Sequence, residues 1–457
     1  KKLLDMEALN RFRNNAMNPE KPVTRGSAQN PDIFFQAKES INRFYLAIPD
    51  VVNDYMSEIS KITGREYKPF TYYGAPDAEN IIIAMGSVTD TTKEVIDYLR
   101  DKGEKVGLIS VHLYRPFSSK YFFNVFPKSV KRITVLERTK EPGAPGEPLY
   151  LDIKDAFYNC SQKPLIIGGR YGLSSKDTTP SQILSVFENM KLKEPKNQFT
   201  VGIVDDVTFT SLPVLPEINV ALPGTYSAKF YGLGSDGTVG ANKNSIKIIG
   251  DNTNKYCQAY FAYDSKKSGG VTTSHLRFGD KPIRSPYLVI TPDFVACHVP
   301  SYLDKYDMLK GLKKNGIFLL NSIWDAEETK NRLPDYMKKY MAENNINFYI
   351  INATSIAEEI GLGTRTNTIM QAAFFKVANV IPYEQAEDEM KKAINKTYGR
   401  KGENVVKMNY AAVDRGGQVT KVDVPAEWAN IVVKKEEDTR DIPAFVREVM
   451  EPMLAMK

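Results

Sequence analysis

The sequence contains 457 residues, of which 25% are charged and 42% are hydrophobic, and its formal net charge is +6. A chain of this length predicts two to four domains, because a single core rarely grows so large. The ordinary composition, without a strongly basic block, gives no indication of nucleic-acid binding. No apolar run approaches the roughly 18 residues that a membrane-spanning helix needs, so no membrane partner is expected either.

The three cysteines, Cys160, Cys257 and Cys297, lie far apart in the sequence. Disulfide frameworks, zinc sites and iron–sulfur clusters need closely spaced thiols, so we expect none of them, and no other metal site, within this chain. Unpaired cysteines favour a reducing compartment, and we expect a cytoplasmic protein. The chain opens on Lys1 without a methionine, so we expect it to be a piece of a longer protein.

The first 70 residues predict helices and no sheet. Apolar residues recur at helical spacing over residues 5–16 and again over residues 32–63, and a proline-rich loop at 18–31 separates the two stretches. Pro49 is expected to break or kink the longer helix. Too little strand is present for an independent sheet domain, so this region predicts the tail of a domain.

Residues 71–226 alternate between apolar strands and helices, which is typical of an α/β domain with a mainly parallel sheet. Strands are predicted at residues 80–85, 105–111, 132–136, 164–168 and 199–204. The proline-rich run at 212–216 closes this region as a linker.

A second α/β domain is predicted from residue 227 onward. Its strands are predicted near Phe230 and at residues 257–263, 287–290, 316–320 and 348–351, and its helices at residues 300–312, 334–344 and 368–380. From about residue 400 the pattern becomes polar and less periodic, which predicts an irregular arm. Trp428 is expected to anchor this arm on a neighbouring surface.

Four glycines, Gly232, Gly234, Gly237 and Gly240, follow the first strand of this second domain and precede an apolar helical pattern. Glycines at such a turn let backbone N–H groups approach a phosphate, and the helix start favours an anion. The cluster could also be only a tight turn. Because strand, turn, helix and second strand occur in the required order, we favour the phosphate cradle.

Several ligands fit that cradle. Asp264 at the end of the second strand would suit a nicotinamide dinucleotide, whereas Lys266 and Lys267 would suit a phosphorylated ribose or the 3′-phosphate of coenzyme A. A lysine pair is also an ordinary solvated feature. A second glycine-broken loop ends at Asn367, which could bind a ligand or cap the following helix.

Other candidate residues have plain structural explanations. The three histidines, His112, His275 and His298, show no metal-ligand spacing, and structural roles are expected for them. Asp205 and Asp206 could be paired functional carboxylates, although a turn at a strand end explains them more simply. We find no Ser-His-Asp, nucleophile-elbow or phosphate-loop pattern and therefore expect no catalytic residue.

Several stretches together resemble pyruvate:ferredoxin (flavodoxin) oxidoreductases: residues 23–32, 75–87, 114–117, 135–143 and 230–247. The resemblance runs in order along essentially the whole chain. It implies that residues 1–70 end the first, thiamine-pyrimidine-side domain and that residues 71–226 form a transketolase C-terminal-like domain. Residues 227–424 would then be a Rossmann-like coenzyme-A-binding domain, and residues 425–457 the start of a connecting domain.

The full enzymes of this family oxidatively decarboxylate pyruvate with coenzyme A to acetyl-CoA and CO2, and reduce ferredoxin or flavodoxin. The resemblance implies that thiamine diphosphate, Mg and iron–sulfur clusters are carried by domains outside this segment, which by itself should be inactive. It also implies a homodimer, and a location in the cytoplasm or, in an anaerobic protist, in a hydrogenosome-like organelle. The share of this segment would be to bind coenzyme A and to pack between catalytic domains.

The resemblance implies few site residues. Lys266 and Lys267 match the place where the family presents basic residues to coenzyme A, and Asn367 lies in a loop that matches another coenzyme contact. The glycine turn, Gly232, Gly234 and Gly237, would lie beside them. Arg25 and Ser27 would reach the active centre from the first domain. Two alternatives stay open: an NAD(P)-dependent dehydrogenase and a non-catalytic scaffold.

Overall fold

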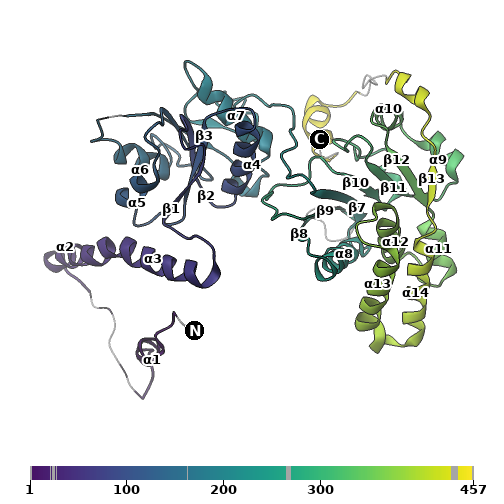
Figure 1. Cartoon of the computed structure of the whole chain (residues 1–457), viewed down its shortest axis with the longest axis horizontal. Helices are drawn as coiled ribbons and strands as arrows, with labels where there is room; N and C mark the ends of the chain where they lie inside the picture. The colour runs from purple at the N-terminus through teal and green to yellow at the C-terminus, as the bar shows by residue number, and fades with distance from the viewer. Residues whose placement is uncertain are drawn as a thin grey trace. The chain divides into compact units, whose positions relative to one another are not determined.

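The computed structural model describes residues 3–20, 22, 26, 28–161, 163–263, 269–433 and 441–454. The chain forms two compact units, Lys1–Val220 and Ala221–Lys457, each built around one sheet (Figure 1). Both units are mixed α/β. Among the described residues, no helix combines the length and apolar character that crossing a membrane requires.

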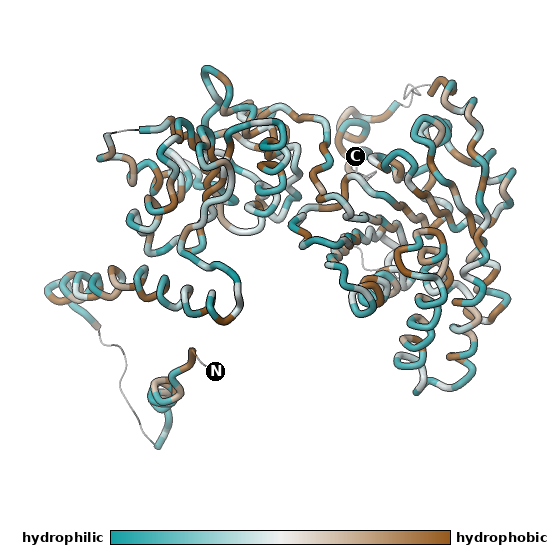
Figure 2. Tube along the Cα trace, viewed as in Figure 1, coloured by the Kyte–Doolittle hydropathy of each residue, from teal (hydrophilic) through white to brown (hydrophobic). Residues whose placement is uncertain are grey.

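The first unit begins with three helices: α1 (Met6–Asn14), α2 (Pro31–Ser40) and α3 (Asn42–Thr63). Of the break or kink predicted at Pro49, the break is wrong. Pro49 lies inside α3 and is its one buried residue, and the helical stretch divides at Ile41 instead. Hydrophobic side chains alternate with hydrophilic ones along α2 and α3, and large ones such as Phe35 and Leu46 are exposed (Figure 2).

The six-stranded sheet of the first unit has the order β1-β3-β2-β4-β5-β6, and only β1 is antiparallel to its neighbour. Its strands are β1 (Phe70–Gly74), β2 (Asn80–Met85), β3 (Val106–Val111), β4 (Arg132–Glu137), β5 (Leu165–Arg170) and β6 (Phe199–Thr200). The mainly parallel sheet is therefore confirmed, while β1 was missed. The predicted strand at 199–204 is too long, because the chain turns at Gly202, whose φ is +83°.

Helices cover both faces of this sheet. They are α4 (Val88–Arg100), α5 (Ser119–Val125), α6 (Pro148–Ala156) and α7 (Pro180–Lys191), with a short 3-10 turn, η1 (Leu173–Ser175). Alternate residues of β2 point to opposite faces: Ile82 packs in one core cluster with residues of α4 and α7, and Ile83 packs in the other with Phe122 and Leu149.

The second unit contains a seven-stranded sheet with the order β13-β12-β11-β10-β7-β9-β8. Its strands are β7 (Tyr226–Leu233), β8 (Tyr256–Tyr263), β9 (Val271–Gly279), β10 (Phe294–Cys297), β11 (Ile317–Asn321), β12 (Asn347–Ile351) and β13 (Thr420–Val422). Only β9 and β13 run against the common direction. The simple strand–helix–strand unit predicted after Phe230 needs correction, because β9 lies between β7 and β8.

The predicted strand at 287–290 is wrong, and the strand is β10. Arg277 explains the difference, since its guanidinium donates hydrogen bonds to the carbonyls of Tyr287 (2.8 Å) and Leu288 (2.9 Å). The N–H of Val289 donates to His275 Nδ1 at 3.1 Å. Side chains of β9 thus take the backbone groups that a strand at 287–290 would have paired with a neighbouring strand.

The helices of the second unit are α8 (Thr238–Asn252), α9 (Ala326–Arg332), α10 (Asp335–Glu343), α11 (Ala353–Glu359), α12 (Asn367–Ala378), α13 (Tyr383–Tyr398), α14 (Glu403–Gly416) and α15 (Glu451–Leu454). Shorter turns are η2 (Pro300–Tyr302), η3 (Gly399–Lys401), η4 (Ala426–Asn430) and the π-helical η5 (Val446–Met450). The predicted helix at 300–312 is wrong beyond η2. The expected irregularity after residue 400 is wrong where α14 and β13 form.

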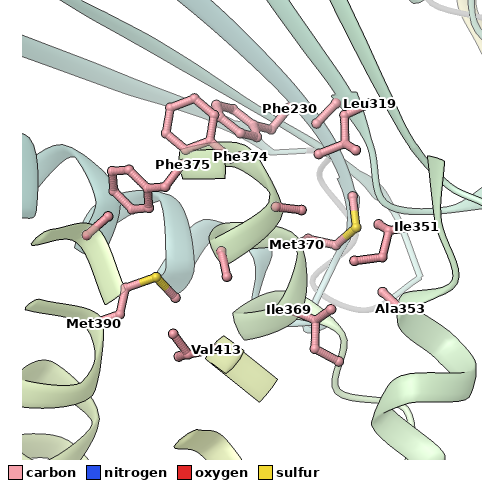
Figure 3. Close-up of a cluster of buried hydrophobic side chains, with 14 of the residues drawn as sticks. Phe230, Leu319, Ile351, Ala353, Ile369, Met370, Phe374, Phe375, Met390 and Val413 are labelled. Atoms are coloured by element: carbon pink, nitrogen blue, oxygen red, sulfur yellow. The ribbon is translucent and has the colours of Figure 1, made fainter. Parts of the chain in front are cut away.

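Aromatic and aliphatic residues join this sheet to the helices on one of its faces (Figure 3). Phe230 of β7, Phe294 of β10 and Phe374 of α12 lie with ring centroids 5.0–5.4 Å apart. Met390 of α13 and Val413 of α14 extend the same buried cluster. This packing fixes the start of α8 beside the start of α12, where the candidate site lies.

The other face of the sheet packs against the segment around η2 and against α10. Trp428 of η4 belongs to this second cluster, with the ammonium group of Lys338 5.8 Å from its ring centroid. Lys339 Nζ donates to the carbonyl of Ile431 at 3.2 Å. The predicted anchoring role of Trp428 is confirmed, and its anchor surface is α10.

Candidate functional site

The glycine-rich segment forms the predicted strand, turn and helix. Strand β7 ends at Leu233, and α8 starts at Thr238 with Gly237 as its N-cap. Gly237 has a φ of +90°, a backbone conformation that glycine adopts without steric cost. The N–H of Gly234 donates to the carbonyl of Gly270 at 2.7 Å, which ties the turn to the start of β9.

Gly232 serves the packing of the turn. A Cβ atom at this position would lie 2.7 Å from both Cβ and Oγ1 of Thr238. The end of strand β7 and the first turn of α8 therefore lie closer together than a side chain at residue 232 would allow.

A carboxylate that sequence reasoning missed fills part of the turn. Asp236 accepts hydrogen bonds from the N–H of Leu233 (2.8 Å), the N–H of Thr238 (2.7 Å) and Thr238 Oγ1 (2.8 Å). By helical geometry, the N–H groups of Val239 and Gly240 are the donors of the first turn that lie beyond this carboxylate. An anion at the helix start would therefore meet Asp236, and we place no phosphate inside the turn.

His298 contacts the first residue of α8, at the end of the glycine turn. Its Nδ1 lies 3.0 Å from Thr238 Oγ1, and its carbonyl accepts from Asn321 Nδ2 at 3.0 Å. Burial lowers the pKa of His298 to about 4, against the opposing effect of Asp236. The imidazole is therefore neutral at pH 7, in agreement with the structural role expected for it.

Two predicted site residues from distant parts of the sequence meet here. A Cβ atom on Gly237 would lie 2.9 Å from Cγ of Asn367, so the amide of Asn367 lies directly against the glycine turn. Asn367 is the first residue of α12, whose N-cap is Thr366 without a side-chain capping bond. The capping role that the sequence left open for Asn367 is therefore not observed.

A cleft of about 290 Å³ opens beside this contact, between α8, α12 and α13. Asn244 and Gln371 lie within it and are joined by a hydrogen bond from Gln371 Nε2 to Asn244 Oδ1 at 2.9 Å. Met390, Ile394 and Tyr398 supply its apolar wall. Among the residues that line it, none is charged, so the cleft suits neutral polar groups beside an apolar body.

The remaining predicted site residues cannot be placed. Lys266, Lys267, Arg25 and Ser27 lie outside the described residues, as does Asp264. Within the part of the chain that the structure describes, no cluster of three His, Cys, Asp or Glu residues could hold a metal ion. The cysteines Cys160, Cys257 and Cys297 form no disulfide bond.

Asp205 in the first unit stabilises its own turn. Its carboxylate accepts from the N–H groups of Val207, Thr208 and Thr210 and from the hydroxyls of both threonines. These bonds, led by that from the Thr208 hydroxyl, hold the pKa of Asp205 well below its usual range. This geometry supports the turn interpretation over a pair of functional carboxylates.

Residues 227–419 match the family model described as pyruvate ferredoxin/flavodoxin oxidoreductase, and residues 78–183 match pyruvate:ferredoxin oxidoreductase core domain II. The chain is 56% identical over 453 residues to a pyruvate-flavodoxin oxidoreductase from Enterobacter agglomerans, covering 99% of this chain and 38% of that protein. The resemblance read from the sequence is confirmed.

A second curated relative and a solved structure also match the chain. The chain is 53% identical over 457 residues to a pyruvate:ferredoxin oxidoreductase from Moorella thermoacetica, covering 100% of this chain and 39% of that protein. It thus spans 38–39% of the length of these two curated relatives. Among solved structures, a pyruvate oxidoreductase subunit from Thermotoga maritima matches with 22% identity and a TM-score of 0.36, covering 44% of this chain and 99% of that one.

Proposed function

We propose that this chain is part of a pyruvate:ferredoxin or pyruvate:flavodoxin oxidoreductase, with coenzyme A bound in the second unit. The full enzyme would convert pyruvate and coenzyme A to acetyl-CoA and CO2 and reduce ferredoxin or flavodoxin. The identity of 53–56% to relatives named for this activity supports the first part. The observation that carries the second part is the contact of Gly237 with Asn367 beside the cleft.

The described lining of the cleft suits the pantetheine arm of coenzyme A, which carries two amides on a largely apolar chain. Asn244, Asn367 and Gln371 offer amide groups, and Ile394 and Tyr398 offer apolar surface. A cleft of about 290 Å³ is at the small end of ligand sites, so it would hold only part of the coenzyme. By holding the pantetheine arm, these residues would position the thiol group of coenzyme A.

The phosphates need cations, and the cleft lining supplies none. We therefore assign the nucleotide phosphates to Lys266 and Lys267, which follow β8 in the sequence, as the resemblance implies. Because Asp236 occupies part of the glycine turn, the turn would act by keeping the start of α8 close to Asn367.

Isothermal titration of the 457-residue chain with coenzyme A tests this proposal. Replacing Lys266 and Lys267 together by alanine should weaken binding at least tenfold, because each charge-assisted contact contributes about 1.5–3 kcal/mol. Lys243→Ala with Lys247→Ala is the matched control, since both lysines are exposed on α8 and the charge change is the same. Equal affinities for the two double variants would refute the lysine assignment.

Asn367→Ala tests the cleft separately, and it should also weaken coenzyme A binding about tenfold through the lost amide contact. Titration with NADPH distinguishes the dehydrogenase alternative, since saturable NADPH binding without coenzyme A binding would favour that function. A chain that binds neither nucleotide would favour a scaffold. No step through thiamine diphosphate or an iron–sulfur cluster is assigned to this chain.

A further inference from the structure

A second cleft, of about 240 Å³, lies wholly within the first unit, where strands β4, β5 and β6 end. Arg170 at the end of β5 and Thr200 at the end of β6 line it, as do Lys140, which follows β4, and Lys176, which follows η1. Ligands of open α/β sheets bind at the carboxyl ends of the strands. This cleft is separate from the coenzyme A site proposed above, which lies in the other unit.

The charge in this cleft is unbalanced. Three cationic residues line it, Lys140, Arg170 and Lys176, beside one carboxylate, Asp205, which already accepts hydrogen bonds from its own turn. Arg170 already has partners: its Nη1 lies 3.5 Å from Glu147 Oε1, and its guanidinium donates hydrogen bonds to the side chain and the carbonyl of Gln198. Among the described residues, neither Lys140 nor Lys176 has an acidic partner within ion-pair distance. Two ammonium groups are thus free to meet an anion.

One wall of the cleft is apolar. Leu173 and Ile203 are 45% and 48% exposed, and they lie on the cleft together with the buried Val201 and Tyr171. Tyr171 is held in place by a hydrogen bond from its hydroxyl to the carbonyl of Met85 at 3.4 Å. Leu173 and Ile203 would lose contact with water if a ligand with an apolar body occupied the space between them.

The loops that form the cleft are held in uncommon conformations. Ser174, Ser175 and Phe209 have φ values of 53°, 61° and 54°, in the left-handed region that costs non-glycine residues about 1–2 kcal/mol each. Such strain persists where the surroundings impose it, and it clusters at ligand sites.

Two cations impose this geometry. Arg138 donates to the carbonyl of Gly172 at 2.9 Å and to Ser175 Oγ at 2.6 Å. Lys196 donates to the carbonyls of Phe209 at 2.9 Å and Ser211 at 3.0 Å. Both sides of the cleft are therefore built in advance of any ligand.

We propose that this cleft binds a small organic anion, a carboxylate or a phosphate attached to an apolar group. Lys140 and Lys176 pair with the anionic group, and Leu173 and Ile203 pack against the apolar part. Arg170 also lines the cleft, and its contacts with Glu147 and Gln198 keep it fixed. The two lysines determine affinity for the charge, and the apolar wall selects among anions.

The test is isothermal titration of the 457-residue chain with phenyl phosphate, benzoate, inorganic phosphate and phenol. At least one of the two aromatic anions should bind saturably, and whichever binds more tightly identifies the head group as phosphate or carboxylate. Inorganic phosphate and phenol, which each lack one half of the proposed chemistry, should bind at least tenfold more weakly. If neither aromatic anion binds, the proposal is wrong.

Two double variants test whether the aromatic anion binds in this cleft. Lys140→Ala with Lys176→Ala should weaken binding of the aromatic anion at least tenfold, whereas Lys128→Ala with Lys193→Ala, exposed lysines of the same unit outside the cleft, should leave it unchanged. Equal effects of the two pairs would overturn the assignment. Excess coenzyme A should not displace the anion, because the two sites lie in different units; displacement would place the probe in the other site and end the proposal.

Discussion

The two α/β units place a cleft near the carboxyl ends of their parallel strands, yet the clefts differ in charge. The cleft of the second unit lies where α8 and α12 start, and its lining is uncharged. The cleft of the first unit is lined by loops and carries three cations. Sheet topology thus determines where each cleft lies, and the loops that follow the strands determine which ligand chemistry it suits.

The units also differ in how their backbone turns are fixed. In the second unit a glycine, Gly237, adopts the left-handed conformation, and a neighbouring amide, Asn367, fills the space that a side chain would take. In the first unit ordinary residues such as Ser175 and Phe209 are forced into that conformation by hydrogen bonds from Arg138 and Lys196. A substitution at Gly237 should therefore act through steric overlap, and one at Arg138 or Lys196 through lost hydrogen bonds.

The largest effect is expected for Gly237→Val. Valine in the left-handed region is strained, and its Cβ would lie 2.9 Å from Asn367 Cγ, so we expect a loss of about 2–4 kcal/mol of unfolding free energy. Both tryptophans, Trp324 and Trp428, lie in the second unit, so urea unfolding followed by tryptophan fluorescence reports on this unit alone.

Gly240→Ala is the matched control for that substitution. Gly240 lies in the first turn of the same helix, and a Cβ atom at this position would have open space around it, with nothing within 4 Å. Alanine there should leave the unfolding free energy unchanged or raise it by up to about 1 kcal/mol, because alanine favours helix. A similar loss in both variants would mean that the Gly237 conformation is not what matters.

An effect of intermediate size is expected from pH. Burial, with a smaller contribution from Lys229, lowers the pKa of His275 in the second unit to about 3. Since the unfolded chain binds this proton near pH 6.5, the contribution of His275 to stability is complete above pH 6.5 and is lost as pH falls toward 3. The loss is at most about 1.4 kcal/mol per pH unit for one group.

His275→Gln should therefore flatten the pH dependence of the tryptophan-monitored unfolding free energy between pH 6.5 and pH 4. The first unit supplies the control: His112 belongs to it and both tryptophans belong to the second unit, so His112→Gln should not change the same curve. Unchanged slopes in His275→Gln would show that His275 is not buried in its neutral form. His298, whose pKa is lowered to about 4, should account for part of the slope that remains.

Sequence reasoning succeeded where local pattern decides the structure. The continuous apolar run of β2 and the glycine turn before α8 are both visible in the sequence, and both formed as predicted. It failed where distant side chains decide. Strand β9 contains polar residues such as His275 and Arg277, yet all nine of its residues are buried, and these two side chains bond to the backbone of residues 287–289.

The candidate site shows the same division. Gly237 and Asn367 were both predicted as site residues, but their contact depends on how α8 and α12 pack against one sheet, which no local pattern encodes. Asp236 lies within the predicted turn and was overlooked, although a carboxylate two residues before a threonine at a helix start is a common turn former. The strained loops around Arg170 gave no signal, because serine and phenylalanine do not indicate a left-handed backbone.

The smallest effect is expected for Asp205→Asn, which keeps one oxygen acceptor and removes the other together with the charge. The N–H groups of Thr208 and Thr210 donate to different oxygens of Asp205, each at 3.0 Å, so at least one of the two bonds should be lost. Hydrogen exchange should therefore become faster at residues 207–210, while tryptophan-monitored unfolding of the second unit stays unchanged. Asp206→Asn is the control: the neighbouring carboxylate makes none of the hydrogen bonds that fix this turn, so exchange there should not change. If both substitutions speed exchange equally, the two carboxylates act as a pair, and the contrast between a hydrogen-bonded turn in one unit and a glycine turn in the other would fail.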